Sequence, residues 1–248
     1  MKKCGEKNDL TFALLSIGVY CVLQSLAGPL GQLVGSKYSV SAIFALVQAL
    51  FLWHFLHQNH LTQKYGLCKP AVPAKRVLYY LPLVVLSTSN LWNGIAVNLS
   101  WTEALWYILL MLCVGFLEEL IFRGLLFQAM AKDSLPMAMA VSSLTFGLGH
   151  LLNLVNGSGM SLADNLLQVT IAIAFGFLFS ALALRCGSLL PCMLAHGAIN
   201  ITSAFANTDG STVEKRIVSS VILMVIALAY ALILIKRAPP LSEEEQRP

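Results

Sequence analysis

Charged residues are scarce in this chain: Asp, Glu, Lys and Arg make up 11% of its 248 residues, against about a quarter in an average soluble domain. Hydrophobic residues make up 57% of the chain, and the mean hydropathy is +0.74. This composition excludes an ordinary soluble globular domain and predicts a membrane protein. One crossing needs about 20 apolar residues, so the length accommodates about eight crossings and no separate soluble domain.

The chain also lacks a C-x-x-C pair, an H-E-x-x-H motif and any internal repeat. Its six cysteines are spread through mostly apolar segments, so we interpret them as small buried side chains and not as a disulfide or zinc framework. The net charge of +4 comes from scattered residues, which excludes a nucleic-acid-binding patch. The first apolar segment lacks a small-x-small cleavage site, so we expect it to be retained as a helix.

Apolar segments separated by polar or turn-forming residues predict an all-α, polytopic membrane protein with about eight transmembrane helices. The predicted helices cover residues 10–34, 40–56, 77–97, 104–131, 136–155, 162–185, 188–205 and 217–235. We expect one transmembrane domain over residues 1–237, with its motifs gathered in 104–200. Residues 238–248 open with two consecutive prolines after the alanine and contain three consecutive acidic residues, which is typical of a disordered tail.

The distribution of Lys and Arg predicts the orientation of these helices. With the N-terminus in the cytoplasm, only Lys37, Lys215 and Arg216 fall outside, and Arg123 falls within a helix. An even number of crossings then returns the C-terminus to the cytoplasm. We therefore expect both termini on the cytoplasmic side.

Carboxylates interrupt the apolar segment 104–131. Glu118 and Glu119 lie within it, and an ionised carboxylate in hydrocarbon costs several kcal/mol unless it is paired or faces a water-filled cavity. Arg123 follows Glu119 by four residues, which is the spacing of a helical ion pair. Glu118 is left without a local partner.

Two further segments carry polar stripes. The stretch FGLGH places Phe146 and His150 four residues apart, and HGAIN does the same for His196 and Asn200, so each pair shares one helix face. At about 1.5 Å per residue, these side chains fall in one middle slab of the membrane with Glu118. Ionisable residues inside a membrane are functional by default, so the set predicts one polar catalytic cavity.

The residue types in this cavity suit hydrolysis. A carboxylate beside a histidine, here Glu118 and His150, can hold and deprotonate a water molecule. His196 and the Asn200 amide can donate hydrogen bonds to the oxyanion formed when that water attacks a carbonyl. Together they predict water-driven cleavage of an amide bond.

Two alternatives to this chemistry stay open. A zinc ion could activate the water, and its ligands would then be Glu118, His150 and His196, although they come from three different helices. The same helices also carry three candidate nucleophiles: Ser142, Ser143 and Cys192.

The stretches EELIFR, FGLGH and HGAIN resemble, in this order, the EExxxR, FxxxH and HxxxN motifs of the CAAX protease and bacteriocin-processing family of intramembrane endopeptidases, also called Abi. The resemblance implies that Glu118 is the general base that activates water with His150. It also implies that His196 and Asn200 form the oxyanion site. The resemblance also assigns the three remaining motif positions. Glu119 would belong to the catalytic residues, and Arg123 and Phe146 would support them.

The resemblance further implies a substrate, which is a hydrophobic or membrane-associated peptide or protein. The reaction would be of CAAX type or would process a peptide pheromone or bacteriocin, and family membership leaves the metal question open. The short length and Lys-rich loops favour a bacterial cell membrane. Two rival hypotheses are a non-catalytic bacteriocin self-immunity protein and a small transporter that relays protons. We expect the lipid bilayer and the substrate as partners, and the oligomeric state is not predicted.

Overall fold

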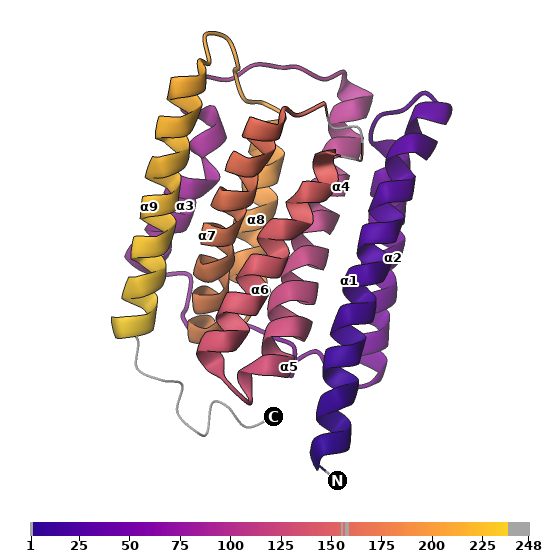
Figure 1. Ribbon diagram of the computed structural model, residues 1–248, viewed down its shortest axis with the longest axis vertical. Helices are drawn as coiled ribbons and strands as arrows, with labels where there is room; N and C mark the ends of the chain where they lie inside the picture. Colours follow the sequence, from indigo (N-terminus) through magenta and orange to yellow (C-terminus); the bar gives the residue numbers. More distant parts are fainter. Residues whose placement is uncertain (1, 155, 157–158, 238–248) are drawn as a thin grey trace.

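Helices build this protein, as Figure 1 shows for the computed structural model. The structure describes residues 2–154, 156 and 159–237. Within these residues the extended backbone contributes an isolated bridge between Ile95 and Ala206 and no strand, so the predicted all-α class is confirmed. The tail predicted at 238–248 lies outside the described residues.

The helices follow the predicted order. They are α1 (Lys2–Leu33), α2 (Ser39–Gln58), α3 (Val77–Ser87), η1 (Ser89–Leu91), α4 (Trp101–Glu119), η2 (Leu120–Leu126), α5 (Phe127–Ala131), α6 (Leu135–Gly149), η3 (His150–Leu154), α7 (Leu162–Cys186), α8 (Leu190–Ser203) and α9 (Val213–Arg237). Here η1 and η3 are 3-10 turns, and η2 is a π-helical turn. Because α4, η2 and α5 are continuous, and α6 continues into η3, the described residues form the eight helical rods that the sequence predicts.

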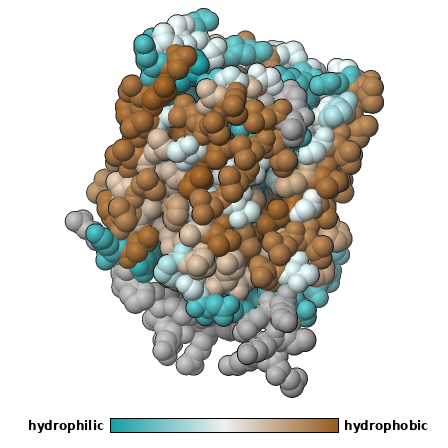
Figure 2. All heavy atoms as spheres, in the orientation of Figure 1, coloured by the Kyte–Doolittle hydropathy of each residue, from teal (hydrophilic) through white to brown (hydrophobic). Residues whose placement is uncertain are grey.

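Six of these rods are long and apolar enough to cross a membrane within the described residues. The other two, α3 and α8, are shorter, with 11 and 14 residues. Figure 2 shows hydrophobic side chains over the middle of the visible face and hydrophilic ones towards its two ends. This apolar belt is the surface that lipid covers in a membrane protein.

The third helix is shorter than predicted. The apolar pattern predicts a helix over 77–97, but α3 ends at Ser87, and the chain leaves the helical path after η1. Gly94 has a φ of +96°, a conformation that suits glycine and ends a helix. The Asn90 amide also donates to the Ile199 carbonyl of α8 at 2.7 Å. A contact with a distant helix therefore overrides the local apolar pattern.

The rods pack in a defined order across the bundle. The α1–α2 pair lies on one side in Figure 1, the rods of α4, α6, α7 and α8 lie in the middle, and α3 and α9 lie on the other side. The N-terminal end of α1 and the C-terminal end of α9 lie at the same end of the bundle, as an even number of crossings requires. The side on which the cytoplasm lies stays a prediction.

Helices α4 and α8 approach each other through glycines. A Cβ atom added at Gly115 of α4 would lie 3.0 Å from the Gly197 nitrogen and 3.3 Å from the Met193 carbonyl oxygen, both in the backbone of α8. Small residues allow this close backbone approach in membrane bundles. Glu118 and Glu119 follow Gly115 by one turn, and His196 precedes Gly197, so this contact sets how near those side chains come.

The glycine contact predicts that alanine destabilises the protein more at Gly115 than at Gly197. Gly115→Ala should lower the free energy of unfolding by about 1–3 kcal/mol, because the new methyl group meets packed backbone. Gly197→Ala should be neutral or slightly stabilising, because its Cβ would meet the Leu112 side chain at 3.8 Å, an ordinary contact distance. Thermal unfolding of both variants in one detergent checks this. Equal melting temperatures would contradict the assigned contact.

Candidate active site

Two carboxylates stand at the end of α4. Glu118 and Glu119 are its last residues, and the chain continues there into the π turn η2. In η2 the Phe122 carbonyl accepts the N–H of Phe127 and also the Ser142 hydroxyl, the latter at 2.8 Å. π turns are frequent at functional sites. This π turn follows the two carboxylates directly, and the Ser142 side chain of α6 binds its Phe122 carbonyl.

Glu119 is fully buried and paired with a cation. The Arg123 Nη1 lies 3.2 Å from the Glu119 Oε1, and neither side chain has any exposed surface. The guanidinium also lies 4.1 Å from the Phe146 ring centroid and 5.7 Å from that of Phe179. A buried charge needs such compensation, because removing either partner leaves the other uncompensated in an apolar medium. This pair agrees with the spacing expected from the sequence.

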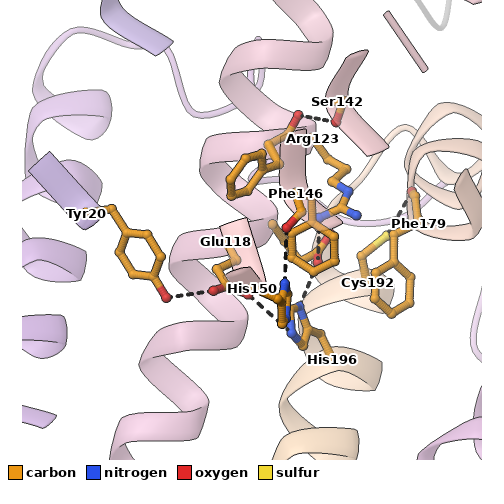
Figure 3. A network of polar contacts seen from close by, with 11 residues as sticks. Tyr20, Glu118, Arg123, Ser142, Phe146, His150, Phe179, Cys192 and His196 are labelled. Carbon is orange, nitrogen blue, oxygen red and sulfur yellow. Dashed lines mark hydrogen bonds and ion pairs between the residues drawn. The ribbon is translucent and has the colours of Figure 1, made fainter. Parts of the chain in front are cut away.

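His196 of α8 lies between the two carboxylates, and Figure 3 shows it beside Glu118. Its Nδ1 is 2.8 Å from the Glu119 Oε1, and its Nε2 is 3.5 Å from the Glu118 Oε2. The imidazole is 7% exposed and stacks on Phe179 of α7, with centroids 5.8 Å apart. Donation from Nδ1 to a buried carboxylate fixes the ring orientation, so Nε2 is directed towards Glu118.

Glu118 has a second partner from a distant part of the chain. The Tyr20 hydroxyl of α1 donates to the Glu118 Oε1 at 2.7 Å, as Figure 3 shows. The Glu118 side chain retains 14% exposure, in contrast to the fully buried Glu119. Both oxygens of Glu118 therefore face a polar group, and this carboxylate is the more accessible of the two.

His150 lies where α6 passes into η3. Its Nδ1 is 3.1 Å from the Phe146 carbonyl oxygen, so an Nδ1–H donor leaves Nε2 free as an acceptor. The Asn165 amide of α7 donates to the His150 carbonyl at 2.9 Å. The Phe146 ring contacts both imidazoles, with centroids 5.1 Å from His150 and 5.7 Å from His196. Within the described residues His150 makes no hydrogen bond to Glu118.

Asn200 lies one turn after His196 on α8. Its carbonyl accepts the Tyr107 hydroxyl of α4 at 3.1 Å. Its side-chain amide makes no hydrogen bond to any described residue, and the residue is partly exposed. The amide is therefore free to bind a ligand, and its role in an oxyanion site stays a prediction.

The three candidate nucleophiles each donate a hydrogen bond to a backbone carbonyl. Ser142 donates to Phe122, Ser143 donates to Met139 at 2.6 Å, and the Cys192 thiol donates to Phe179 at 3.4 Å. All three are buried. The Ser142 hydroxyl and the Cys192 thiol bond to a neighbouring helix, and the Ser143 hydroxyl bonds to its own helix, so none of the three has a hydrogen bond to a base among the described residues.

The proposed zinc ligands do not form a ligand set as they are arranged. No group of three or more His, Cys, Asp or Glu side chains in the described part of the chain has the spacing of a metal site. Glu118 is engaged by Tyr20, and His196 is engaged by Glu119. We therefore derive no step through a metal.

Sequence reasoning missed three parts of this site: the π turn, Phe179 and Tyr20. Tyr20 carries a weak signal, since interfacial tyrosines gather near helix ends and Tyr20 lies in the middle of the span Asn8–Leu33. Phe179 resembles any other apolar residue of α7. The π turn depends on a hydrogen bond from α6, which local sequence does not reveal.

Residues 99–202 match a family model described as type II CAAX prenyl endopeptidase Rce1-like. The matched segment runs from just before α4 to the end of α8, so it contains both carboxylates and both histidines but not α1. No curated protein matches the chain.

The buried ion pair predicts that loss of the Arg123 cation lowers the free energy of unfolding far more than loss of an exposed cation such as Lys132. Arg123→Met should lower the free energy of unfolding by about 3–5 kcal/mol, because Glu119 loses its counter-charge. Lys132→Met removes a cation that is 47% exposed and pairs with Asp9, so it should cost less than about 1 kcal/mol. Thermal unfolding of both variants in one detergent measures the contrast. Similar losses would show that Arg123 does not compensate a buried charge.

Proposed function

We propose that this chain, whose residues 99–202 match a family model described as type II CAAX prenyl endopeptidase Rce1-like, hydrolyses a peptide bond in a hydrophobic, membrane-associated substrate. The observation that carries the proposal is the position of His196 between the buried carboxylate of Glu119 and the partly exposed carboxylate of Glu118, which also accepts a hydrogen bond from α1. The family match supports a CAAX-type intramembrane endopeptidase. The residue roles are those that the motif resemblance implies, and the contacts of these side chains support them.

Glu118 is the group that takes a proton from water. Glu119 is fully buried and already paired with Arg123 and His196, so its carboxylate holds the site together. Glu118 is partly exposed and has no cation at its side, which leaves it able to accept a proton. A general base must lie within reach of the water that it activates, and this carboxylate is the accessible one.

His150 supports the same water from α6. Because its Nδ1 is engaged by the Phe146 carbonyl, the free Nε2 accepts a hydrogen bond from water. The water oxygen forms a bond to the substrate carbonyl carbon while its proton moves to Glu118. The electron pair of the C=O bond moves to the carbonyl oxygen, which becomes an oxyanion.

His196 and Asn200 stabilise this oxyanion. The Nδ1 of His196 is held by Glu119, and its Nε2 lies on the Glu118 side, where the oxyanion forms and where an N–H on this atom donates to it. The free amide of Asn200 supplies a second donor one turn along α8. Donors fixed in an apolar site stabilise such charge strongly. Collapse of the intermediate breaks the C–N bond, and the leaving amine takes the proton from Glu118.

The first test compares Glu118→Gln with a matched glutamate variant. Full-length protein in liposomes is offered a panel of fluorogenic hydrophobic peptides, with and without a farnesylated C-terminal cysteine. Glu118→Gln should lower kcat/KM by about 100-fold or more, because the general base is lost. The control Glu103→Gln changes a carboxylate of the same helix that accepts from Ser36, and it should stay within about threefold of wild type, as loss of one hydrogen bond far from the site predicts.

The outcomes separate the functions. Equal cleavage by wild type and Glu118→Gln would overturn the catalytic role of Glu118. If a cell-based immunity assay gave equal protection by both proteins, the function would be binding and not hydrolysis. Cleavage confined to the farnesylated peptides would narrow the substrate to prenylated proteins.

The metal alternative has its own measurement. If the chain's own groups activate the water, a strong zinc chelator should change kcat by less than about twofold after prolonged incubation. A chelator acts by removing a bound zinc ion from its ligands, and this reaction would not use one. Metal analysis of the purified protein accompanies the assay. Loss of activity that returns on addition of zinc would assign the water to a metal.

A further inference from the structure

α1 contributes to the site although it lies outside the segment that matches the family model. We propose that Tyr20 is a positioning residue for Glu118: its hydroxyl holds the carboxylate in the orientation that reaches the attacking water. This inference rests on the proposed role of Glu118 as the base. It extends the site to α1, which the motifs do not include.

The geometry of Glu118 explains why it needs such a partner. Its side chain has no cation at hydrogen-bond distance, and the imidazole Nε2 is 3.5 Å from Oε2, too far for a strong hydrogen bond. The 2.7 Å contact from Tyr20 is therefore its shortest polar contact within the described residues. A hydrogen bond to an ionised acceptor is about twice as strong as a neutral one, so Tyr20 restrains the carboxylate most.

The inner face of α1 is built for this contact. Buried residues recur along it at helical spacing: Ala13, Ser16, Tyr20 and Ala27. Their neighbours Val19 and Val22 are exposed towards the lipid side. The Ser16 hydroxyl returns to the Phe12 carbonyl of its own helix. Tyr20 is the residue of this face whose hydroxyl reaches α4.

An ionic anchor sets the rotation of α1. Asp9 accepts from Lys64 at 2.9 Å, from Tyr65 at 3.1 Å and from Lys132 at 3.1 Å. These donors lie in the loop after α2 and directly after α5. Asp9 precedes Tyr20 by 11 residues, about three turns of helix, so both side chains lie on one face. The anchor therefore keeps Tyr20 directed towards Glu118.

Polar groups near Glu118 come from α1, α4, α8 and the α6 rod. Cys21 follows Tyr20 on α1, Glu119 is its neighbour on α4, and His196 faces it from α8. His150 lies on the α6 rod beyond Phe146. Of these groups, Tyr20 is the neutral donor that can orient the carboxylate without taking its charge, because its O–H donates and stays bonded to oxygen.

The test is Tyr20→Phe, which removes the hydroxyl and keeps the ring. We expect kcat to fall about 10-fold with KM unchanged, because a hydrogen bond to a charged group is lost at the base and not at the substrate. The control Tyr80→Phe removes a hydroxyl that donates to the Val72 carbonyl at 2.7 Å in another part of the bundle, and it should leave kcat unchanged.

A double-mutant cycle separates positioning from packing. Glu118→Asp draws the carboxylate back by one methylene and breaks the contact with Tyr20. Adding Tyr20→Phe to Glu118→Asp should therefore cause less than about twofold further loss, since coupled residues do not act additively. Independent, multiplicative losses, or a change in KM alone, would overturn the proposal.

A spectroscopic readout does not depend on cleavage. The infrared carboxylate band of Glu118, identified from the difference between wild type and Glu118→Gln, should shift in Tyr20→Phe and stay in place in Tyr80→Phe. If no peptide is cleaved but the band shifts, the proposed function fails while the contact stands. An unchanged band would show that Tyr20 does not hold Glu118 and would overturn the inference.

Discussion

The structure depends on the cost of placing carboxylates inside an apolar bundle. Glu119 is fully buried, and several kcal/mol would be lost if its charge had no partner. Arg123 supplies the counter-charge from the next turn, and His196 adds a hydrogen bond from α8. The same requirement draws the aromatic rings of Phe146 and Phe179 over the guanidinium. Four rods of the bundle thus converge on one buried ion pair, Glu119 with Arg123.

Close packing gives this convergence its accuracy. Gly115 lets α8 approach α4 within backbone contact, which places His196 beside the carboxylates that follow one turn later. Ser142 holds the Phe122 carbonyl in the π turn just beyond them. Neither contact carries charge. Both contacts fix the positions of the helices that carry the partners of Glu119, because a packed helix pair has few alternative positions.

The two adjacent carboxylates consequently differ in environment. Glu119 is enclosed and charge-paired, which suits a structural group that orients His196. Glu118 lies one residue earlier, about 100° away around the helix, and it retains access and neutral partners. Two like residues in unlike surroundings are a recurrent way to separate an orienting group from a reacting one. The tyrosine of α1 completes this division, since it restrains Glu118 without neutralising it.

Composition and periodicity determined the all-α membrane class and the eight rods. The four-residue spacing determined the Glu119–Arg123 pair. All of these depend on local order along the chain. The tertiary structure alone decided that α3 ends at Ser87, that a π turn follows the carboxylates, that His196 lies between them and that Tyr20 reaches Glu118. Each of these depends on contacts between helices far apart in sequence. A single sequence records the pairs that one helix can form within itself, but the partners that its polar groups find on other helices are chosen by packing.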